Sequence, residues 1–222
     1  MNATTKRPFL SPGLLLILVA VASVIVGVLA AALLYRPQQT LELEELRAAY
    51  LPGGKPVRPF QLVDHRGERF DNARLEGRWS WVFFGYTHCP DACPLALATL
   101  NAAVEELQAR APELPLQVVM VSVDPARDTL ERLAAYVPHF NPGFIGATGS
   151  DEELRALTRD LGIVYVIHEP EPDRGGYYLV DHSTAILLFN PAGRLQAIFS
   201  QPHIPQSMVD DLLKIQGHYQ SR

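Results

Sequence analysis

The sequence has few cysteines and no concentration of positive charge. Only two of the 222 residues are cysteine, and the length suffices to bury a hydrophobic core without a disulfide framework. The 19 Lys and Arg residues form no basic run, and the formal net charge is −5. Because nucleic-acid binding depends on clustered positive charge, a nucleic-acid partner is not expected. Internal repeats and low-complexity tracts are also absent from the sequence.

One long apolar run lies near the N-terminus. Residues 14–35 form 22 consecutive residues without charge, and a helix of that length, at about 1.5 Å per residue, crosses a hydrocarbon core of about 30 Å. Lys6 and Arg7 precede the run, so the positive-inside rule predicts a cytoplasmic N-terminus. The small residues 30–32 resemble a signal-peptide cleavage site, but a signal peptide has an apolar stretch of only about 7 to 15 residues. A membrane anchor is therefore preferred over a cleaved signal.

The remainder of the chain is acidic and is expected on the side of the membrane opposite the cytoplasm. Three of the 19 basic residues precede Pro37, so 16 basic residues stand against all 24 acidic ones after it, a net charge of −8. A short helix at 41–50 and a Pro/Gly-rich loop at 52–56 indicate a tether. The predicted organisation is a cytoplasmic segment at 1–13, a transmembrane anchor at 14–35, a tether at 36–58 and a compact domain at 59–222.

Within the compact domain, patterns typical of strands alternate with patterns typical of helices. Strands are predicted as two short segments within 60–70 and at 79–86, 116–123, 163–167, 177–180, 185–189 and 196–200. Helices are predicted at 94–111, 128–137, 150–161 and 207–215. This alternation predicts an α/β sandwich with a central parallel or mixed sheet.

Several polar residues are interpreted as helix caps. Asp128 and Ser150 each have a Glu three residues later, the spacing of a capping box, and Asp91 precedes the helix at 94–111. Asp124 and Arg127 lie beside the first of these caps, and helix initiation is the preferred explanation for them, with contact to a partner protein as the alternative.

The two cysteines lie where the strand at 79–86 gives way to the next helix. Helical geometry brings the Cα atoms of Cys89 and Cys93 to about 6 Å, within reach of a disulfide. A disulfide that closes so short a loop stabilises the fold by only about 2 kcal/mol, so a purely structural disulfide is not favoured. The helix dipole lowers the pKa of a thiol in the first turn and favours the thiolate, which attacks disulfides and binds metals. The pair is therefore predicted to be reactive or metal-binding.

Two thiolates need a further ligand to complete a metal site. Thiolates with one imidazole suit Cu(I), whereas structural zinc requires four protein ligands. The sequence has seven histidines, and most of them stand in turns, near helix ends or in the C-terminal segment. His182 lies between two predicted strands, in a loop able to overhang the cysteines. Context alone leaves the choice of histidine open.

Four segments together resemble the Sco/SenC family, in the same order and context. They are FGYTHCPDACP at 84–94, SVDPARDT at 122–129, GATG at 146–149 and VDHS at 180–183. The chain is identified as a member of this family of membrane-anchored, thioredoxin-fold copper chaperones over residues 56–214. The resemblance implies that Cys89 and Cys93, able to form a disulfide, and His182 bind a copper ion. Ala147 replaces a leucine found in many members and touches none of these positions.

The resemblance also implies a function and its partners. The expected activity is delivery of copper to the binuclear copper centre of cytochrome c oxidase subunit II, with other copper chaperones as further partners. The expected location is the inner membrane, with a single span and a periplasmic main domain. The alternative is a thiol:disulfide oxidoreductase in which Cys89 attacks and Cys93 resolves the mixed disulfide. A thiol peroxidase is a third possibility that no motif supports. His182 separates the first two, because copper needs the imidazole and dithiol exchange does not.

Overall fold

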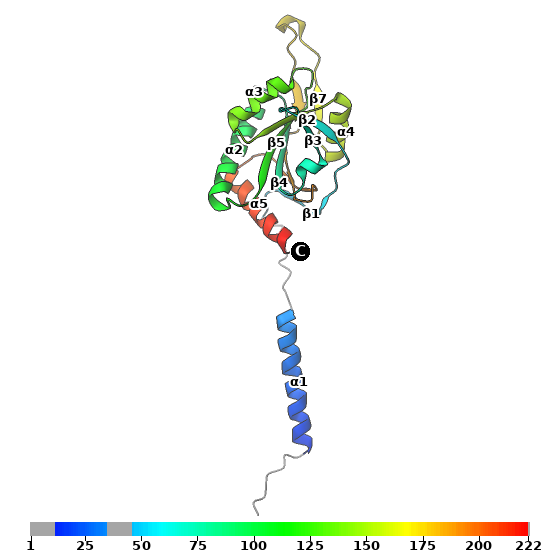
Figure 1. The fold of residues 1–222 in the computed structure, drawn as a ribbon, viewed down its shortest axis with the longest axis vertical. Coiled ribbons are helices and arrows are strands. Elements are labelled where there is room, and N and C mark those ends of the chain that lie inside the picture. The colour runs from blue at the N-terminus through cyan, green and yellow to red at the C-terminus, as the bar shows by residue number, and fades with distance from the viewer. Residues whose placement is uncertain (1–11, 35–45, 222) are drawn as a thin grey trace, which may run out of the picture. The chain divides into compact units, whose positions relative to one another are not determined.

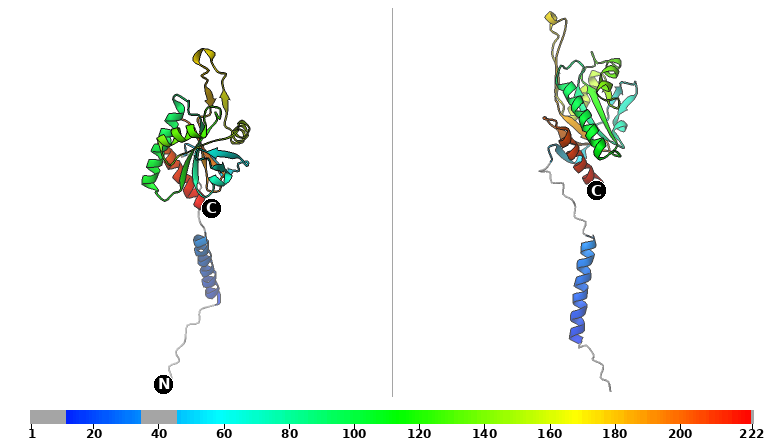
Figure 2. Two further views of the ribbon diagram at one scale, coloured as in Figure 1. Left: turned by 45° about the horizontal axis from the view of Figure 1, so that its top comes forward. Right: turned by 90° about the vertical axis from the view of Figure 1, so that its left-hand side faces the viewer.

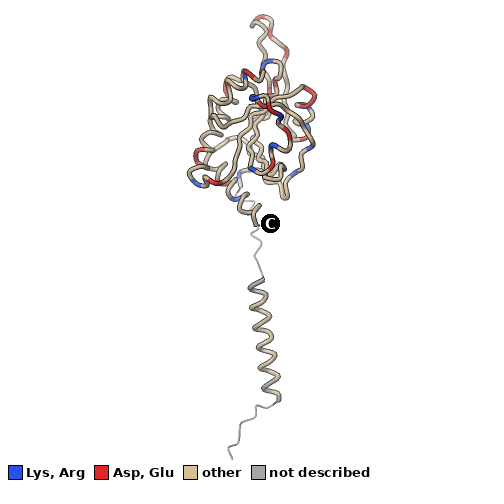
Figure 3. The backbone as a smooth tube through the Cα atoms, viewed as in Figure 1, with Lys and Arg blue, Asp and Glu red and all other residues tan. Residues whose placement is uncertain are grey.

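The computed structural model describes residues 12–34 and 46–221, which belong to two separate units. The first unit contains helix α1 (Pro12–Leu34), which carries no charged residue (Figure 3). Judged on the described residues alone, no helix is both long enough and apolar enough to cross a membrane, and the anchor at 14–35 stays a prediction from the full sequence. Residues 1–11 and 35–45 lie outside the described residues, and with them most of the predicted cytoplasmic segment and the first part of the predicted tether.

The second unit is built on one large sheet and one small sheet (Figure 1). The strands are β1 (Ala49–Lys55), β2 (Gln61–Asp64), β3 (Arg69–Asp71), β4 (Trp79–Gly85), β5 (Leu116–Ser122), β6 (Ile145–Thr148), β7 (Tyr165–Ile167), β8 (Val180–His182), β9 (Ile186–Phe189) and β10 (Leu195–Phe199). The helices are α2 (Ala92–Arg110), α3 (Leu130–Phe140), α4 (Asp151–Leu161) and α5 (Pro205–Gln220), with short 3-10 turns at Asn72–Leu75 and Pro172–Arg174. The eight-stranded sheet has the order β1-β10-β9-β4-β5-β6-β2-β3, and β7 pairs with β8 separately.

The large sheet is mixed, as the sequence predicts. Strands β4, β5 and β6 are parallel, and every other pairing in the sheet is antiparallel. All seven residues of β4 are buried, which explains its unbroken apolar run, because a central strand is covered on both faces.

Helices cover both faces of the sheet. Trp79 in β4 meets Tyr219 in α5 with ring centroids 5.5 Å apart, and α5 packs beside α2 on this face (Figure 2). Phe84, which points the opposite way from the strand, shares an internal gap with Leu157 of α4. The result is a three-layer α/β sandwich that leaves the carboxyl end of β4 free to carry the cysteine segment.

The predicted tether is wrong from residue 49 onward. Strand β1 pairs antiparallel with β10, with Ala49 opposite Ile198, so the compact unit begins before residue 59. Gly53 and Gly54 have φ values of 76° and 67°, and they allow the register shift within the strand. Arg194 donates hydrogen bonds to both glycine carbonyls. Local turn residues indicated a loop, but the open edge of β10 determines the structure.

The segment around His182 also differs from prediction. The sequence predicts a strand at 177–180 with a loop after it, whereas β8 begins at Val180 and ends at His182. Antiparallel pairing with β7 sets this register and places His182 opposite Tyr165. His182 is therefore held by a short hairpin rather than by an overhanging loop.

Candidate metal centre

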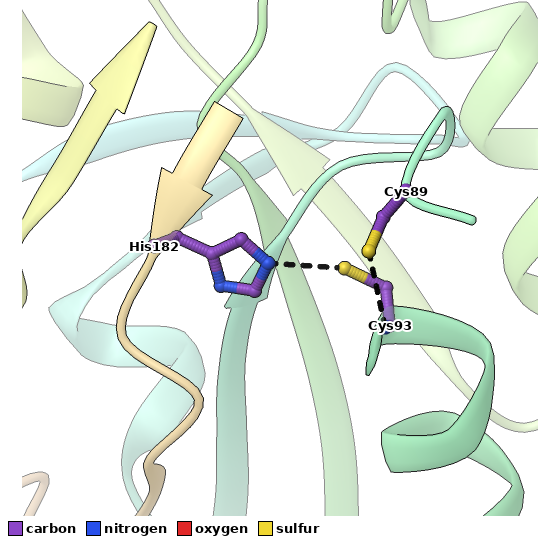
Figure 4. Close-up of side chains that lie close together, drawn as sticks. All are labelled: Cys89, Cys93 and His182. Atoms are coloured by element: carbon purple, nitrogen blue, oxygen red, sulfur yellow. Dashed lines mark hydrogen bonds between the residues drawn. The ribbon is translucent and has the colours of Figure 1, made fainter. Parts of the chain in front are cut away.

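Cys89, Cys93 and His182 come together in space. Their ligand atoms, two sulfurs and one imidazole nitrogen, all lie within 4.8 Å of one another. Cys89 precedes α2, Cys93 is the second residue of α2, and His182 ends β8 (Figure 4). No other group of three potential metal ligands is found among the residues that the structure describes. Topology thus joins residues that are 89 positions apart in the chain.

A glycine makes the close approach of Cys93 possible. Gly85 ends β4 directly beneath the cysteine, and a Cβ atom there would lie 2.8 Å from the Cys93 sulfur and 2.7 Å from the Phe83 ring. Both distances are too short for non-bonded atoms. The glycine in the FGYTHC segment is therefore needed for packing at the site.

The imidazole of His182 is oriented and neutral. Its Nδ1 lies 3.0 Å from the carbonyl oxygen of Ser183. A carbonyl only accepts hydrogen bonds, so Nδ1 must carry the hydrogen, and Nε2 presents its lone pair toward the Cys93 sulfur at 3.3 Å. Burial lowers the pKa of His182, so the ring is uncharged at neutral pH. A neutral imidazole fixed through its other nitrogen is the usual form of a histidine metal ligand.

The two thiols differ in environment. Cys93 is buried, and desolvation raises its pKa well above the ordinary value, with neighbouring negative groups adding to the effect. The helix position in the sequence predicts a lowered pKa, and this prediction is wrong for Cys93 because burial outweighs the helix dipole. Cys89 is half-buried and accepts a hydrogen bond from the Cys93 backbone N–H at 3.4 Å. Metal binding must therefore displace a proton from Cys93.

Aromatic rings enclose the imidazole. Phe83 and Tyr86 approach His182 edge-on, with ring centroids 5.8 and 5.9 Å away. Burial raises the pKa of Tyr86, so its phenol is uncharged as well. The walls around the cluster are thus neutral and mostly apolar, which suits a soft, weakly hydrated metal ion better than a hard one.

Asp128 holds the cysteine segment in place and does not cap a helix. Its carboxylate accepts hydrogen bonds from the Thr87 backbone N–H at 2.8 Å, from the Thr87 hydroxyl at 2.6 Å and from the Ser122 hydroxyl at 2.6 Å. The cap of α3 is Thr129, which accepts from the Arg132 N–H. The predicted capping role of Asp128 is therefore wrong, because its side chain turns inward to the segment before Cys89. The Ser150 cap is confirmed.

We expect Asp128→Ala to lower the free energy of unfolding by about 3 kcal/mol, since it leaves buried donors without an acceptor. Asp91→Ala is the matched control. Asp91 occupies the N-cap position of α2 but is exposed and makes no side-chain capping bond, so its loss should change stability by less than about 0.5 kcal/mol. Urea unfolding followed by the fluorescence of the two tryptophans measures both. Equal effects of the two substitutions would contradict the assignment.

Other histidines do not join the cluster. His88 follows the chain away from Cys89, with Nδ1 3.2 Å from the Thr87 hydroxyl. His65 accepts a hydrogen bond from the Gly146 N–H, and His203 bonds to the Thr184 carbonyl oxygen. Each of these three rings has a structural partner of its own.

Comparison with known proteins places the chain in a family. A model of the SCO1/SenC family matches residues 49–217, a range that begins at β1. The chain belongs to the SCO1/SenC family. The bovine mitochondrial protein SCO2 homolog is 34% identical over 186 residues, covering 84% of this chain and 68% of that protein.

Solved Sco structures share its architecture. Arabidopsis thaliana ScoI with copper bound is 35% identical, with a TM-score of 0.68, and covers 73% of this chain and 99% of that one. Yeast Sco1 with copper bound is 29% identical, with a TM-score of 0.67, over 76% of this chain and 90% of that one. The predicted thioredoxin-like α/β fold of the Sco family, with a central mixed sheet, is confirmed.

Proposed function

We propose that this protein is a copper chaperone that binds Cu(I) through Cys89, Cys93 and His182. It delivers the ion to the binuclear copper centre of cytochrome c oxidase subunit II, and another copper chaperone supplies it. The observation that carries this proposal is the neutral imidazole of His182, aimed at two thiols within 4.8 Å. Two related Sco structures have copper bound, and the ligand set of two soft sulfurs with one nitrogen favours Cu(I).

Exposed apolar side chains near the site are suited to docking of subunit II, the proposed copper acceptor. Outside α1, the exposed large apolar side chains of the described residues are Leu95, Val164, Val166, Ile167 and Leu179. Leu95 lies two residues after Cys93, and the others lie in or beside the β7–β8 hairpin that carries His182. Exposed apolar patches are typical of protein interaction sites. We infer that subunit II contacts some of these side chains when it receives the metal.

The second candidate is a thiol:disulfide oxidoreductase, which the difference between the two thiols favours. Half-buried Cys89 would attack a target disulfide as the thiolate, forming a mixed disulfide and releasing one target thiol. Cys93 would then attack the Cys89 sulfur, releasing the second target thiol. The target gains two electrons, and the chain ends with a Cys89–Cys93 disulfide. This chemistry has no need of a nitrogen ligand.

Copper transfer distinguishes the two candidates. The reduced, Cu(I)-loaded chain is mixed with the copper-free, reduced copper domain of subunit II, and the copper on each protein is measured after separation. We expect copper to move to subunit II, while a Cys89→Ser/Cys93→Ser chain should deliver none. Retention of copper by the chain, together with rapid reduction of an oxidised subunit II, would instead support the oxidoreductase.

We also propose that residues 14–35 anchor the chain in the inner membrane. The 22 uncharged residues and the preceding Lys6 and Arg7 support a cytoplasmic N-terminus and a periplasmic main domain. Such a location would place the copper site on the side where disulfides can also form.

The topology can be tested with a reporter. A phosphatase that is active only after export, fused after Arg222, should be active, whereas a reporter that fluoresces only in the cytoplasm should be dark at the same position. Lys6→Glu/Arg7→Glu is the matched variant and should reduce the exported fraction. A bright cytoplasmic reporter on the unaltered chain would contradict both the orientation and delivery on the outer side.

A further inference from the structure

Arg127 is half-buried and contacts two tyrosines that neighbour the metal ligands, without being a ligand itself. Its side chain is 17% exposed, and its Nε lies 2.5 Å from a carboxylate oxygen of fully buried Asp124. Its Nη1 donates a hydrogen bond to the Tyr178 carbonyl oxygen at 2.9 Å. The guanidinium carbon lies 3.4 Å from the Tyr178 ring centroid and 5.5 Å from that of Tyr86.

The two tyrosines connect Arg127 with the two segments that carry the metal ligands. Tyr86 contacts the His182 ring edge-on, and its carbonyl oxygen accepts a hydrogen bond from the Cys89 N–H at 3.3 Å. Tyr178 lies two residues before β8, and its hydroxyl donates to Asp124 at 2.8 Å. Arg127 is thus in contact with the segment that carries Cys89 and with the hairpin that carries His182.

The hairpin depends on such contacts for its position. Strands β7 and β8 have three residues each and form a separate two-stranded sheet, with no strand pairing to the eight-stranded sheet. A two-stranded hairpin is marginally stable by itself. Apart from the chain connections to α4 and β9, its attachment to the rest of the unit relies on side-chain contacts, and Arg127 joins it to the segment after β5.

We propose that Arg127, held by Asp124, is a positioning residue that sets the place of His182 relative to the two thiols. The inference rests on the proposed copper site and adds a residue that does not coordinate the metal. Its planar guanidinium lies against the Tyr178 ring, which accounts for a buried Nη2 that has no hydrogen-bond acceptor. A ligand placed before the metal arrives binds it more tightly, because binding does not have to order the ligand.

The test is a double-mutant cycle on Cu(I) affinity, measured by chelator competition on the reduced full chain. Arg127→Ala should weaken binding by about 10-fold, at the lower end of the effect of outer contacts on a metal ligand. His182→Ala should weaken it at least as much. If Arg127 acts through His182, the double variant should be no weaker than His182→Ala to within about 2-fold.

Arg74→Ala is the matched control. Arg74 also pairs with a buried carboxylate, that of Asp64, and lies over an aromatic ring, that of Phe70 at 5.6 Å. Its carbonyl oxygen accepts a hydrogen bond from Gln117 near the start of β5, at the opposite end of the parallel strands from the cysteines, which follow the end of β4. Its loss should reduce thermal stability and leave copper affinity unchanged. A fall in affinity with Arg74→Ala equal to that with Arg127→Ala would reduce the role of Arg127 to general stability and overturn the inference.

Two further readouts keep the inference falsifiable. In the electron paramagnetic resonance spectrum of the Cu(II)-loaded chain, the nitrogen hyperfine splitting from His182 should weaken in Arg127→Ala and not in Arg74→Ala. Should Arg127→Ala fail to fold, Arg127→Lys is the substitute, because it keeps a positive charge for Asp124 without the planar group. It should lose less Cu(I) affinity than the loss of about 10-fold expected for Arg127→Ala. If the losses of Cu(I) affinity in Arg127→Ala and His182→Ala add in the double variant, Arg127 does not act through His182. That result would overturn this inference and leave the proposed copper site standing. Equal copper affinity of the unaltered chain and His182→Ala would overturn the copper site and this inference with it.

Discussion

A chain oxidised to the Cys89–Cys93 disulfide is expected to bind copper at least about 100-fold more weakly than the reduced chain. The same two sulfurs serve either the bridge or the metal, and a disulfide has no thiolate to offer. The sulfurs lie within 4.8 Å of each other, so a small movement brings them to bonding distance. Loss of both leaves only the imidazole of His182 as a protein ligand.

Equilibrium dialysis of the two redox forms against buffered copper measures this difference. Blocking of free thiols before mass spectrometry establishes the redox state of each sample. A Cys89→Ser/Cys93→Ser chain is the matched control and should bind copper as weakly as the oxidised chain, with or without reductant. Equal copper retention in the reduced and fully oxidised forms would exclude the two cysteines as joint ligands.

His182→Ala is expected to weaken Cu(I) binding by at least about 10- to 100-fold, since even contacts outside the ligand shell cost that much. The substitution leaves a two-coordinate site of two thiolates. His88→Ala is the matched control, because His88 adjoins Cys89 in sequence but bonds to the Thr87 hydroxyl instead of facing the sulfurs. Its copper affinity should match that of the unaltered chain.

The same variant separates the chaperone from the oxidoreductase. Attack of Cys89 on a model disulfide does not require the imidazole, so the rate of mixed-disulfide formation in His182→Ala should be close to that of the unaltered chain. Measuring this first step alone avoids the later attack by Cys93, whose sulfur lies 3.3 Å from the His182 ring. Lost exchange with intact copper affinity would favour the oxidoreductase.

Much of the fold follows from local sequence patterns. The buried strand at 79–86 and the helix at 94–111 appear as β4 and α2, because a continuous apolar run and helical spacing each bury a face. The structure departs from these predictions where residues distant in the sequence determine the local structure. Residues 49–55 carry turn signals yet form β1, because β10 offers a free edge, and β8 takes its register from β7.

The site was located in the sequence by the cysteine spacing and the family resemblance, but not in its detail. Asp128 has the spacing of a capping box, and only the folded chain brings Thr87 and Ser122 to its carboxylate. The pKa of Cys93 depends on burial, which a helix position does not reveal. The contact of Arg127 with Tyr178 spans 51 residues, so helix initiation was a sufficient local explanation for the arginine.

The measurement that tests the account most directly is X-ray absorption at the copper edge of the reduced, Cu(I)-loaded chain, combined with the copper content per chain. The account predicts one copper per chain with two sulfur neighbours and one nitrogen neighbour, the nitrogen being absent in His182→Ala. Coordination by sulfur alone in the unaltered chain, or one copper shared by two chains, would contradict a site made of Cys89, Cys93 and His182.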